Sequence, residues 1–431
     1  MAGIVFLVFG IFLILAFPLA VSMMLGAWTP VIFGAPGVAG VGQIIRNTFS
    51  GADTTPMIAV PLFILGGVIM SEGGISRKLF NVFAYIFGKK TGGLPIAVLL
   101  TTMFYGSISG SAVAVTAAVG SMAIPFLSDM GYEKKFSAAM IAVAGGLGII
   151  LPPSIPMVMY SLATGVSTGE LFLAGIFPGI LVTSFLIAYA VYYCWRKGED
   201  KAKIAAAVDE MRKTNFLIVL KDSFWALLSP VIILGGIYSG IFTPTEAACI
   251  SVFYALIISV FIYKTVPLNG VLKLLRSAVK TYSALCFMIA FAIAFGRTLT
   301  LLKAPDMISS FVLGVSQSKV VIIFVIIFIF YLIGMVMDIG PVIVIMAPIL
   351  LPIVKALGVD PVHFGIFMVV NLAISMATPP FGLNVFVTST ISETPPMTVF
   401  RMATPFIIMF TVALLVIAYV PSVSLFILGR G

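Results

Sequence analysis

Charged residues are scarce in this chain of 431 residues, because Asp, Glu, Lys and Arg together make up 9% of it. A soluble domain carries about 25% charged residues, so the composition excludes a water-soluble globular protein. Hydrophobic residues make up 61% of the chain, and the mean hydropathy is +1.22. One bilayer span needs about 20 apolar residues, and the chain offers roughly ten such runs. The sequence therefore predicts a polytopic helical membrane protein.

Histidine and cysteine are also scarce, and this limits the chemistry that the chain can perform. Ser109 could act as an intramembrane serine nucleophile, but the one histidine, His363, lies in a distant segment. An intramembrane aspartyl protease needs two aspartates, and Asp338 is the one that lies well inside an apolar run. A metalloprotease HExxH motif and a phosphate-binding P-loop motif are both absent. Three cysteines in or beside apolar runs form no disulfide framework. The sequence thus argues against an enzyme and against ATP-driven pumping.

Basic residues concentrate in a few segments between apolar runs, which argues against a nucleic-acid partner despite the net charge of +9. The positive-inside rule places these segments in the cytoplasm and the N-terminus outside. The apolar run 4–25 is too long for a secretory signal, so we predict that it is the first membrane helix. The longest polar stretch is predicted to be a solvated surface helix that links two halves. The basic segments, predicted to be loops, are 77–90, 134–135, 196–221 and 264–280.

Two proline pairs interrupt otherwise apolar stretches, in "GIILPPSIPM" (148–157) and in "SMATPPFGLN" (375–384). Proline lacks the N–H of the helix ladder, and it also forces the preceding residue out of helical geometry. Lipid cannot bind the freed carbonyl groups, so a broken helix at membrane depth must be buried in protein or line a polar cavity. The sequence therefore predicts two broken helices that serve a site.

A shift of 227 residues superposes turn and proline positions in the two halves of the chain without a gap. Lys134 and Lys135 follow the first superposed turn, whereas Asp360 and His363 follow the second. This opposite charge bias predicts that one turn is cytoplasmic and the other external, so the repeats are inverted. Inverted repeats with discontinuous helices are typical of secondary transporters. The superposed positions are Pro125 with Pro352, Gly131 with Gly358, Glu133 with Asp360, and the two proline pairs.

Each repeat also contains a candidate re-entrant hairpin, in segments 104–127 and 331–352, with small or polar residues midway. We expect each half of these hairpins to be too short to cross the membrane. A hairpin tip beside each broken helix would gather carbonyl groups, hydroxyl groups and helix ends near the membrane midplane. Hard cations prefer oxygen ligands, so a sodium site is predicted there. The candidates, some acting through backbone carbonyls, are Ser107, Ser109, Gly148, Leu151, Pro152, Gly334, Ser375, Thr378 and Phe381. Close helix packing by Gly and Ser is the alternative role for each of them.

Asp338 is the strongest single candidate, because a carboxylate inside an apolar stretch is costly and by default functional. Arg297 ends an apolar helix and could bind a substrate carboxylate or extend to the membrane interface. Ser111 and Asn384 complete the candidate substrate-binding residues. Glu246 follows Thr243 at the spacing of a helix-capping box, so we predict a capping role for it.

These motifs together resemble the large membrane subunit of the tripartite ATP-independent periplasmic (TRAP) transporters. The resemblance implies an ion transporter superfamily-like fold in which a scaffold holds a mobile, elevator-type transport domain with two re-entrant hairpins and two broken helices. Ser375 departs from this pattern, because glycine is expected before "TPP". The stretches that carry the resemblance are "PLFILGGVIMSEGGIS" (61–76), "SISGSAVA" (107–114), "AGGLGIILPPS" (144–154), "GIFTPTEAA" (240–248), "DIGPVIVIMAPILLPI" (338–353), "GVDPVHFG" (358–365) and "ATPPFG" (377–382).

The resemblance also implies a function: sodium-coupled import of an organic acid, of the C4-dicarboxylate or sialic acid class, across the bacterial inner membrane. It implies two protein partners, a small four-helix membrane subunit on a separate polypeptide and a periplasmic substrate-binding protein. A channel, or a two-component carrier that works without a binding protein, is the alternative. The expected divisions are scaffold helices in 1–90 and 224–303, transport-domain repeats in 91–196 and 304–395, a cytoplasmic linker in 197–223 and a C-terminal helix in 396–431.

Overall fold

The computed structural model describes residues 1–34, 40–315 and 318–430, and these residues form helices and no strand. A helix satisfies its own backbone hydrogen bonds, which is why an apolar chain adopts it in lipid. The elements are α1 (Ala2–Ile14), α2 (Leu19–Ile32), α3 (Val41–Ala52), α4 (Thr55–Glu72), α5 (Ile75–Phe87), α6 (Gly93–Ser109), α7 (Ala112–Asp129), α8 (Lys134–Ala144), α9 (Leu147–Ile150), α10 (Ile155–Thr164), α11 (Thr168–Ala174), α12 (Ile176–Lys197), α13 (Lys201–Arg212), α14 (Phe216–Tyr238), α15 (Pro244–Leu256), η1 (Ile257–Ile262), η2 (Leu268–Gly270), α16 (Val271–Leu301), α17 (Ala304–Val315), α18 (Lys319–Gly334), α19 (Ile339–Ala356), α20 (Pro361–Ser375), α21 (Leu383–Ser392), α22 (Pro396–Tyr419), α23 (Ser422–Leu425) and η3 (Phe426–Leu428).

Seven helices of the described part of the chain are long and apolar enough to cross a membrane, or up to nine if each bent helix pair counts as one span. One bent pair joins α4 to α5 at 65°, and the other joins α8 and α9 to α10 at 43°. The predicted polytopic all-helical class is therefore confirmed. The prediction that each hairpin arm is too short to span was wrong, because α7 and α19 have 18 residues each and pass the same test.

Four other predictions, for the first apolar run and for three basic segments, were wrong in detail. The run 4–25 is not one helix, because Ala16 adopts a left-handed φ of 59° and Pro18 starts a second helix, so that α1 and α2 pack against each other. The basic segment 77–90 lies largely in α5, 134–135 forms the start of α8, and most of 264–280 lies in α16. Positive charge did not mark a loop at these places, since a helix with one buried face tolerates charge on the other face.

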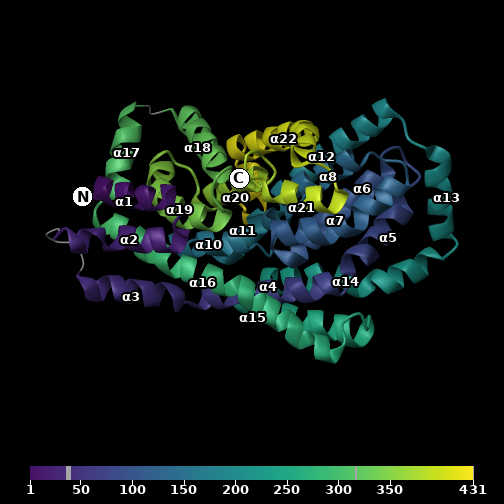
Figure 1. Ribbon diagram of the computed structural model, residues 1–431, viewed down its shortest axis with the longest axis horizontal. Coiled ribbons are helices and arrows are strands. Elements are labelled where there is room, and N and C mark those ends of the chain that lie inside the picture. Colours follow the sequence, from purple (N-terminus) through teal and green to yellow (C-terminus); the bar gives the residue numbers. More distant parts are fainter. Residues whose placement is uncertain (35–39, 316–317, 431) are drawn as a thin grey trace.

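The two repeats are visible in the bounds of the helices. Adding 227 to the bounds of α7 gives the bounds of α19, and the same shift takes the start of α8 to the start of α20. Helices α5, α6 and α10 correspond to α17, α18 and α21 within two residues at each end. Corresponding helices α5 and α17 lie at opposite ends of the molecule (Figure 1). The structure therefore confirms the inverted repeat.

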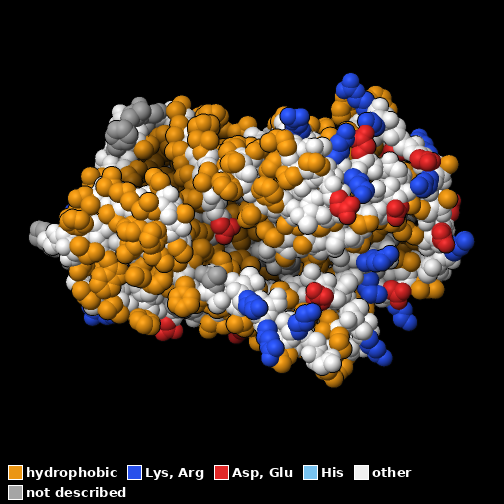
Figure 2. All heavy atoms as spheres, in the orientation of Figure 1, with side chains coloured by type: hydrophobic (Ala, Val, Ile, Leu, Met, Phe, Trp, Pro, Cys, Tyr) orange, Lys and Arg blue, Asp and Glu red, His pale blue; other side chains and the backbone are white. Residues whose placement is uncertain are grey.

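Charged side chains gather at one end of the molecule. On the face that Figure 2 shows, Lys, Arg, Asp and Glu lie mostly over the end formed by α5 and α13, and hydrophobic side chains cover the other end. Helix α13 is the surface helix predicted within 196–221. Arg212 donates to the Tyr85 carbonyl at 2.7 and 3.2 Å, and Lys89 pairs with Asp209 at 2.5 Å. These contacts hold α13 against α5.

Candidate substrate and cation site

The first hairpin turns at Gly110, between α6 and α7. Gly110 has a φ of +66°, and a Cβ atom there would lie 2.9 Å from the carbonyl oxygen of Pro153. The amide of Ile155 donates to the Gly110 carbonyl at 3.5 Å. Ser111 caps α7, because its Oγ accepts a hydrogen bond from the Ala114 amide at 3.4 Å. The tip therefore lies directly on the first proline break, as the sequence predicted.

The first break leaves carbonyl groups without their helical donors. Pro152 and Pro153 cannot donate an N–H to the carbonyls of Gly148 and Ile149 four residues earlier. The Ser154 hydroxyl donates to the Ile149 carbonyl at 2.5 Å. It also caps the start of α10, because it accepts a hydrogen bond from the backbone N–H of Met157. The Gly148 carbonyl lacks its donor at position i+4, and such an oxygen is suited to binding a cation.

At the second break, protein donors already occupy the freed carbonyl groups. The Thr378 hydroxyl donates to the Ser375 carbonyl at 3.0 Å, and the backbone N–H of Asn384 donates to the Met376 carbonyl at 3.0 Å. The Ser375 hydroxyl donates to the Leu372 carbonyl at 2.7 Å within α20. A Cβ atom on Gly334 would lie 2.2 Å from the Ser375 Oγ. The departure from glycine at 375 thus fills space beside the second hairpin, and Gly334 makes room for it.

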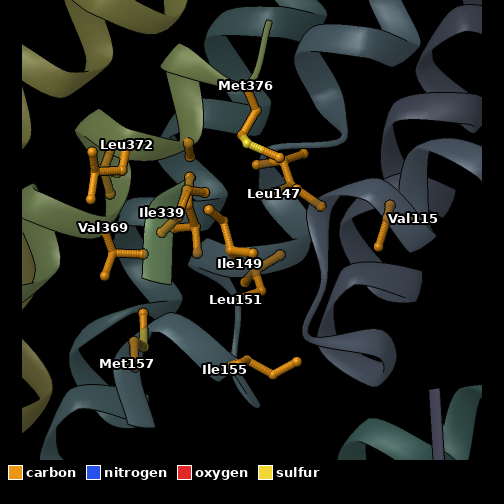
Figure 3. Packing of buried hydrophobic residues seen from close by; sticks show 14 of the residues in the cluster. Val115, Leu147, Ile149, Leu151, Ile155, Met157, Ile339, Val369, Leu372 and Met376 are labelled. Atoms are coloured by element: carbon orange, nitrogen blue, oxygen red, sulfur yellow. The ribbon is translucent and has the colours of Figure 1, made fainter. Parts of the chain in front are cut away.

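Both hairpin tips and both breaks line one cavity of about 250 Å³, which we call the central cavity. Gly110 and Ser111 come from the first tip and Asp338 from the second, and α16 closes one side with Thr281 and Leu285. Figure 3 shows apolar side chains from both repeats around this region. Among them, Ile149, Ile155, Ile339 and Met376 line the central cavity.

Asp338 supplies the one carboxylate in the lining of the central cavity. It occupies the N-cap position of α19, yet its side chain makes no capping hydrogen bond. The carboxylate is therefore not used to cap the helix. A mostly apolar cavity with a few polar groups is the usual form of a small-molecule site.

Ser109 ends α6 immediately before the first tip. Its side chain is 2% exposed, and its hydroxyl has no hydrogen-bond partner among the described residues. It packs against α4, where a Cβ atom on Gly67 would lie 3.4 Å from the Ser109 Oγ. A buried hydroxyl without a partner costs about 1–3 kcal/mol, and a bound ion is one explanation for such a group.

Other predicted cation ligands do not all converge on the same point. The Ser107 hydroxyl donates to the Phe104 carbonyl at 2.7 Å, and Ser107 and Leu151 line a separate apolar pocket of about 340 Å³. Pro152 and Thr378 are buried within the two breaks. The side chain of Phe381 is 58% exposed. In the described part of the chain, no cluster of three His, Cys, Asp or Glu could hold a metal, so a cation here would need carbonyl and hydroxyl oxygens.

Two predicted substrate ligands lie outside the lining of the central cavity. The Arg297 guanidinium donates to Asn47 at 3.1 Å and to Ser50 at 2.9 Å, both on α3. The side-chain amide nitrogen of Asn384 donates to the Ala142 carbonyl at 3.0 Å, and the side-chain amide oxygen lacks a partner among the described residues. A substrate-binding role for either residue stays a prediction.

Sequence analysis did not identify Thr281 and Leu285 as part of the central cavity, because they lie on a helix outside the repeated motifs and form no recognisable pattern.

The capping role predicted for Glu246 is confirmed. Its carboxylate accepts from the Thr243 amide at 2.8 Å, and the Glu246 amide donates to the Thr243 hydroxyl at 3.3 Å.

Comparison with known proteins agrees with this geometry. Residues 4–423 match the family model described as "Tripartite ATP-independent periplasmic transporter, DctM component". The chain is 38% identical over 421 residues to the isethionate TRAP transporter permease protein DctMQ of Oleidesulfovibrio alaskensis. This match covers 98% of the chain and 65% of that relative. The chain thus spans slightly less than two thirds of this relative's length. It is also 38% identical to the C4-dicarboxylate TRAP transporter large permease protein DctM of Pseudomonas aeruginosa, over 93% of the chain and 92% of the relative.

A solved structure shares the fold. The YdaH transporter of Alcanivorax borkumensis, which is described as having an unusual topology, matches with a TM-score of 0.62 and 14% identity. The match covers 88% of this chain and 87% of that one. The relatives bear the names of transporter permeases and not of enzymes. On the match of nearly its whole length, this chain belongs to the DctM component family of the tripartite ATP-independent periplasmic transporters.

Proposed function

We propose that the chain is the large membrane subunit of a sodium-coupled secondary transporter that imports an organic acid. The observation that carries the proposal is the central cavity, where two re-entrant tips and two broken helices from inverted repeats meet. Secondary transporters place their sites at such a junction. The substrate class is organic anions, including C4-dicarboxylates and sialic acids, and the relatives named for isethionate and C4-dicarboxylates support it.

Sodium coupling is supported by the oxygen atoms around the first break. The Ser109 hydroxyl is buried without a partner, and Pro152 deprives the Gly148 carbonyl of its donor. Na⁺ as a coupling ion would bind oxygens of this kind. The second break offers fewer open oxygens, because the Ser375 and Met376 carbonyls already accept hydrogen bonds. We therefore place the stronger cation site in the first repeat.

The transport step is proposed to be an elevator motion. The moving domain would comprise 91–196 and 304–395, which contain both hairpins and both breaks. The scaffold would comprise 1–90 and 224–303. The linker at 197–223 would lie on the cytoplasmic side, and the segment after 395 contains α22, α23 and η3 rather than one helix. A small membrane subunit and a periplasmic binding protein would be the partners, in the bacterial inner membrane.

The decisive experiment is uptake into proteoliposomes that contain the chain and its small subunit. Labelled succinate and labelled sialic acid would be supplied, each with its binding protein, with and without an inward sodium gradient. We expect uptake that requires both sodium and the binding protein. A potassium gradient of equal size is the control for the electrical driving force.

Each other outcome has a definite meaning. Uptake with sodium but without a binding protein would indicate a two-component carrier of the same fold. Non-saturable flux that is the same with and without the binding protein would favour a channel. Uptake that is unchanged in a potassium gradient would refute sodium coupling.

A further inference from the structure

A second, more polar cavity lies away from the central cavity, between the α4–α5 turn and α7. It has a volume of about 670 Å³, and we call it the polar cavity. Its lining includes three charged and three hydroxyl side chains. These six residues are Glu72, Arg77, Asp129, Ser71, Ser76 and Ser121.

The charged groups of the polar cavity are not used to hold the fold together. None of the ion pairs formed by the described residues involves Glu72, Arg77 or Asp129. All three residues are exposed. The Tyr105 hydroxyl is fully buried behind the lining, next to Ser71 and Glu72, and has no hydrogen-bond partner among the described residues. Charges without partners in a concave site are available to a mobile ligand.

One face of α7 connects the two cavities. Val113 lines the central cavity, and Ala117, Ser121 and Pro125 line the polar cavity at successive i+4 positions. Positions four apart share a helix face, and the twelve steps from Val113 to Pro125 cover about 18 Å at 1.5 Å per residue. Ala117, Ser121 and Pro125 are exposed. The face is lined by small side chains, which leave room beside the helix.

The inverted counterpart of this face is less exposed. Val344 on α19, which corresponds to Ala117, is 2% exposed, and Pro348 and Pro352, which correspond to Ser121 and Pro125, are half-buried. The three charged residues of the polar cavity correspond to apolar residues in the second repeat: Leu299, Ala304 and Ala356. The helices therefore repeat, whereas the three charged residues that line the polar cavity at the α5 end have no charged counterparts at the corresponding positions of the second repeat. The predicted cytoplasmic side is the α5 end, where the charged side chains gather (Figure 2).

We propose that the polar cavity is the cytoplasmic vestibule through which the transported anion leaves, and that Arg77 binds its carboxylate or sulfonate group there. This proposal rests on the proposed transport function. Arg77 offers a planar, permanently charged donor group that suits such anions. Glu72 and Asp129 have the sign that attracts Na⁺ to the same exit, and they also keep the anion from binding too tightly to leave. The structure then represents the state that is open to the cytoplasm.

The first test is accessibility, which does not depend on transport. In a variant with Cys194, Cys249 and Cys286 replaced by alanine, Ser121→Cys would be treated with a membrane-impermeant maleimide. We expect labelling in inverted membrane vesicles and not in spheroplasts. Pro348→Cys, the position that corresponds to Ser121 in the second repeat, is the matched control and should stay unlabelled in inverted vesicles. Labelling of Ser121→Cys from outside alone, or from neither side, would overturn the vestibule.

The second test is protection by the anion. Succinate and isethionate would each be added to inverted vesicles carrying Ser121→Cys, against chloride at equal ionic strength. We expect at least one of them to slow labelling, with a half-protecting concentration that rises about tenfold in Arg77→Gln. Lys78→Gln is the control, because the Lys78 ammonium lies 4.2 Å from the centre of the Tyr263 ring and outside the cavity lining.

Protection by neither anion, or equal protection in Arg77→Gln, would refute the anion site. Protection that depends on Arg77 in a protein that shows no sodium-driven uptake would instead support the site and refute the proposed function. The two failures are therefore distinguishable.

Discussion

Individual oxygen atoms at the breaks differ in whether the fold already satisfies them. The Ile149, Ser375 and Met376 carbonyls accept hydrogen bonds from protein donors, whereas the Ser109 hydroxyl has no partner among the described residues. An atom that lacks a partner inside a protein is the one that a ligand stabilises most. Residue-scale tests should therefore separate satisfied from unsatisfied oxygens.

Ser109→Ala should raise the sodium concentration for half-maximal uptake by roughly three- to tenfold, which is about 1 kcal/mol of lost cation binding. The substrate concentration for half-maximal uptake at saturating sodium should change little. The measurement is initial uptake rate against sodium concentration in proteoliposomes. Ser184→Ala is the control, because the Ser184 hydroxyl bonds to the Ile180 carbonyl of its own helix at 2.8 Å. An unchanged sodium dependence in Ser109→Ala would remove this residue from the site.

Asp338→Asn keeps the size of the side chain and removes its charge from the central cavity. Because the carboxylate makes no capping hydrogen bond, the variant should fold normally and lose at least about tenfold of its sodium-driven uptake. Thermal unfolding in detergent checks the fold, and uptake of labelled substrate checks the function. Asp306→Asn, in the first turn of α17 and outside the lining of the central cavity, should keep normal uptake. If both variants transport alike, Asp338 has no part in the site.

At the scale of elements, the contact between a hairpin tip and a broken helix is the unit that builds the site. The tip of α6 and α7 approaches Pro153 closely enough that a side chain at Gly110 would collide with backbone. In the second repeat the close approach is to a side chain, because a Cβ atom on Gly334 would collide with the side chain of Ser375. Backbone contact leaves little freedom for adjustment, so the first tip and its break form the more rigid unit.

Gly110→Ala should destabilise the protein by more than the roughly 1–2 kcal/mol that a left-handed backbone costs a residue with a Cβ atom. Gly165→Ala is the matched control, since Gly165 has a φ of +77° and nothing within 4 Å of its added Cβ. The comparison is the thermal midpoint of both variants in detergent, together with their uptake. We expect a larger loss in both measurements for Gly110→Ala. Equal losses would show that the contact with Pro153 is not important.

At the scale of the whole molecule, inverted repeats give two arrangements of similar energy, one open to each side of the membrane. Corresponding helices α5 and α17 lie at opposite ends, so the exposed face of α7 and the less exposed face of α19 would exchange roles when the molecule switches. Such exchange is the general basis of alternating access in repeat-built transporters. In the proposed elevator motion, the hairpin elements would move against the proposed scaffold.

A cross-link between α16 and α19 should stop transport, because it would tie the proposed scaffold to the proposed moving domain. Met288 and Gly340 suit the pair Met288→Cys with Gly340→Cys, since a Cβ atom on Gly340 would lie 2.9 Å from the Met288 Cε. A bifunctional methanethiosulfonate reagent should arrest uptake in the cysteine-free variant, and dithiothreitol should restore it. The measurement is initial uptake before linking, after linking and after reduction.

The control pair for this cross-link lies within one proposed domain. Gly120→Cys with Ile391→Cys joins α7 to α21, where the added Cβ on Gly120 would lie 3.3 Å from the Ile391 Cδ1. Uptake should survive this link, because both helices would move together. Equal arrest by both links would argue against an elevator motion along the proposed boundary.

The sequence by itself determined the membrane class, the two breaks, the inverted repeat and the presence of Asp338 and Ser111 near the hairpin tips. These follow from local constraints, since proline removes its own N–H and an apolar run must satisfy its own backbone in lipid. Only the tertiary structure decided which oxygens remain open, that Arg297 binds Asn47 and Ser50, and that α7 lines a polar cavity. The physical reason is that these features depend on partners far away in the sequence, and a local pattern contains no record of which distant group satisfies a donor or an acceptor.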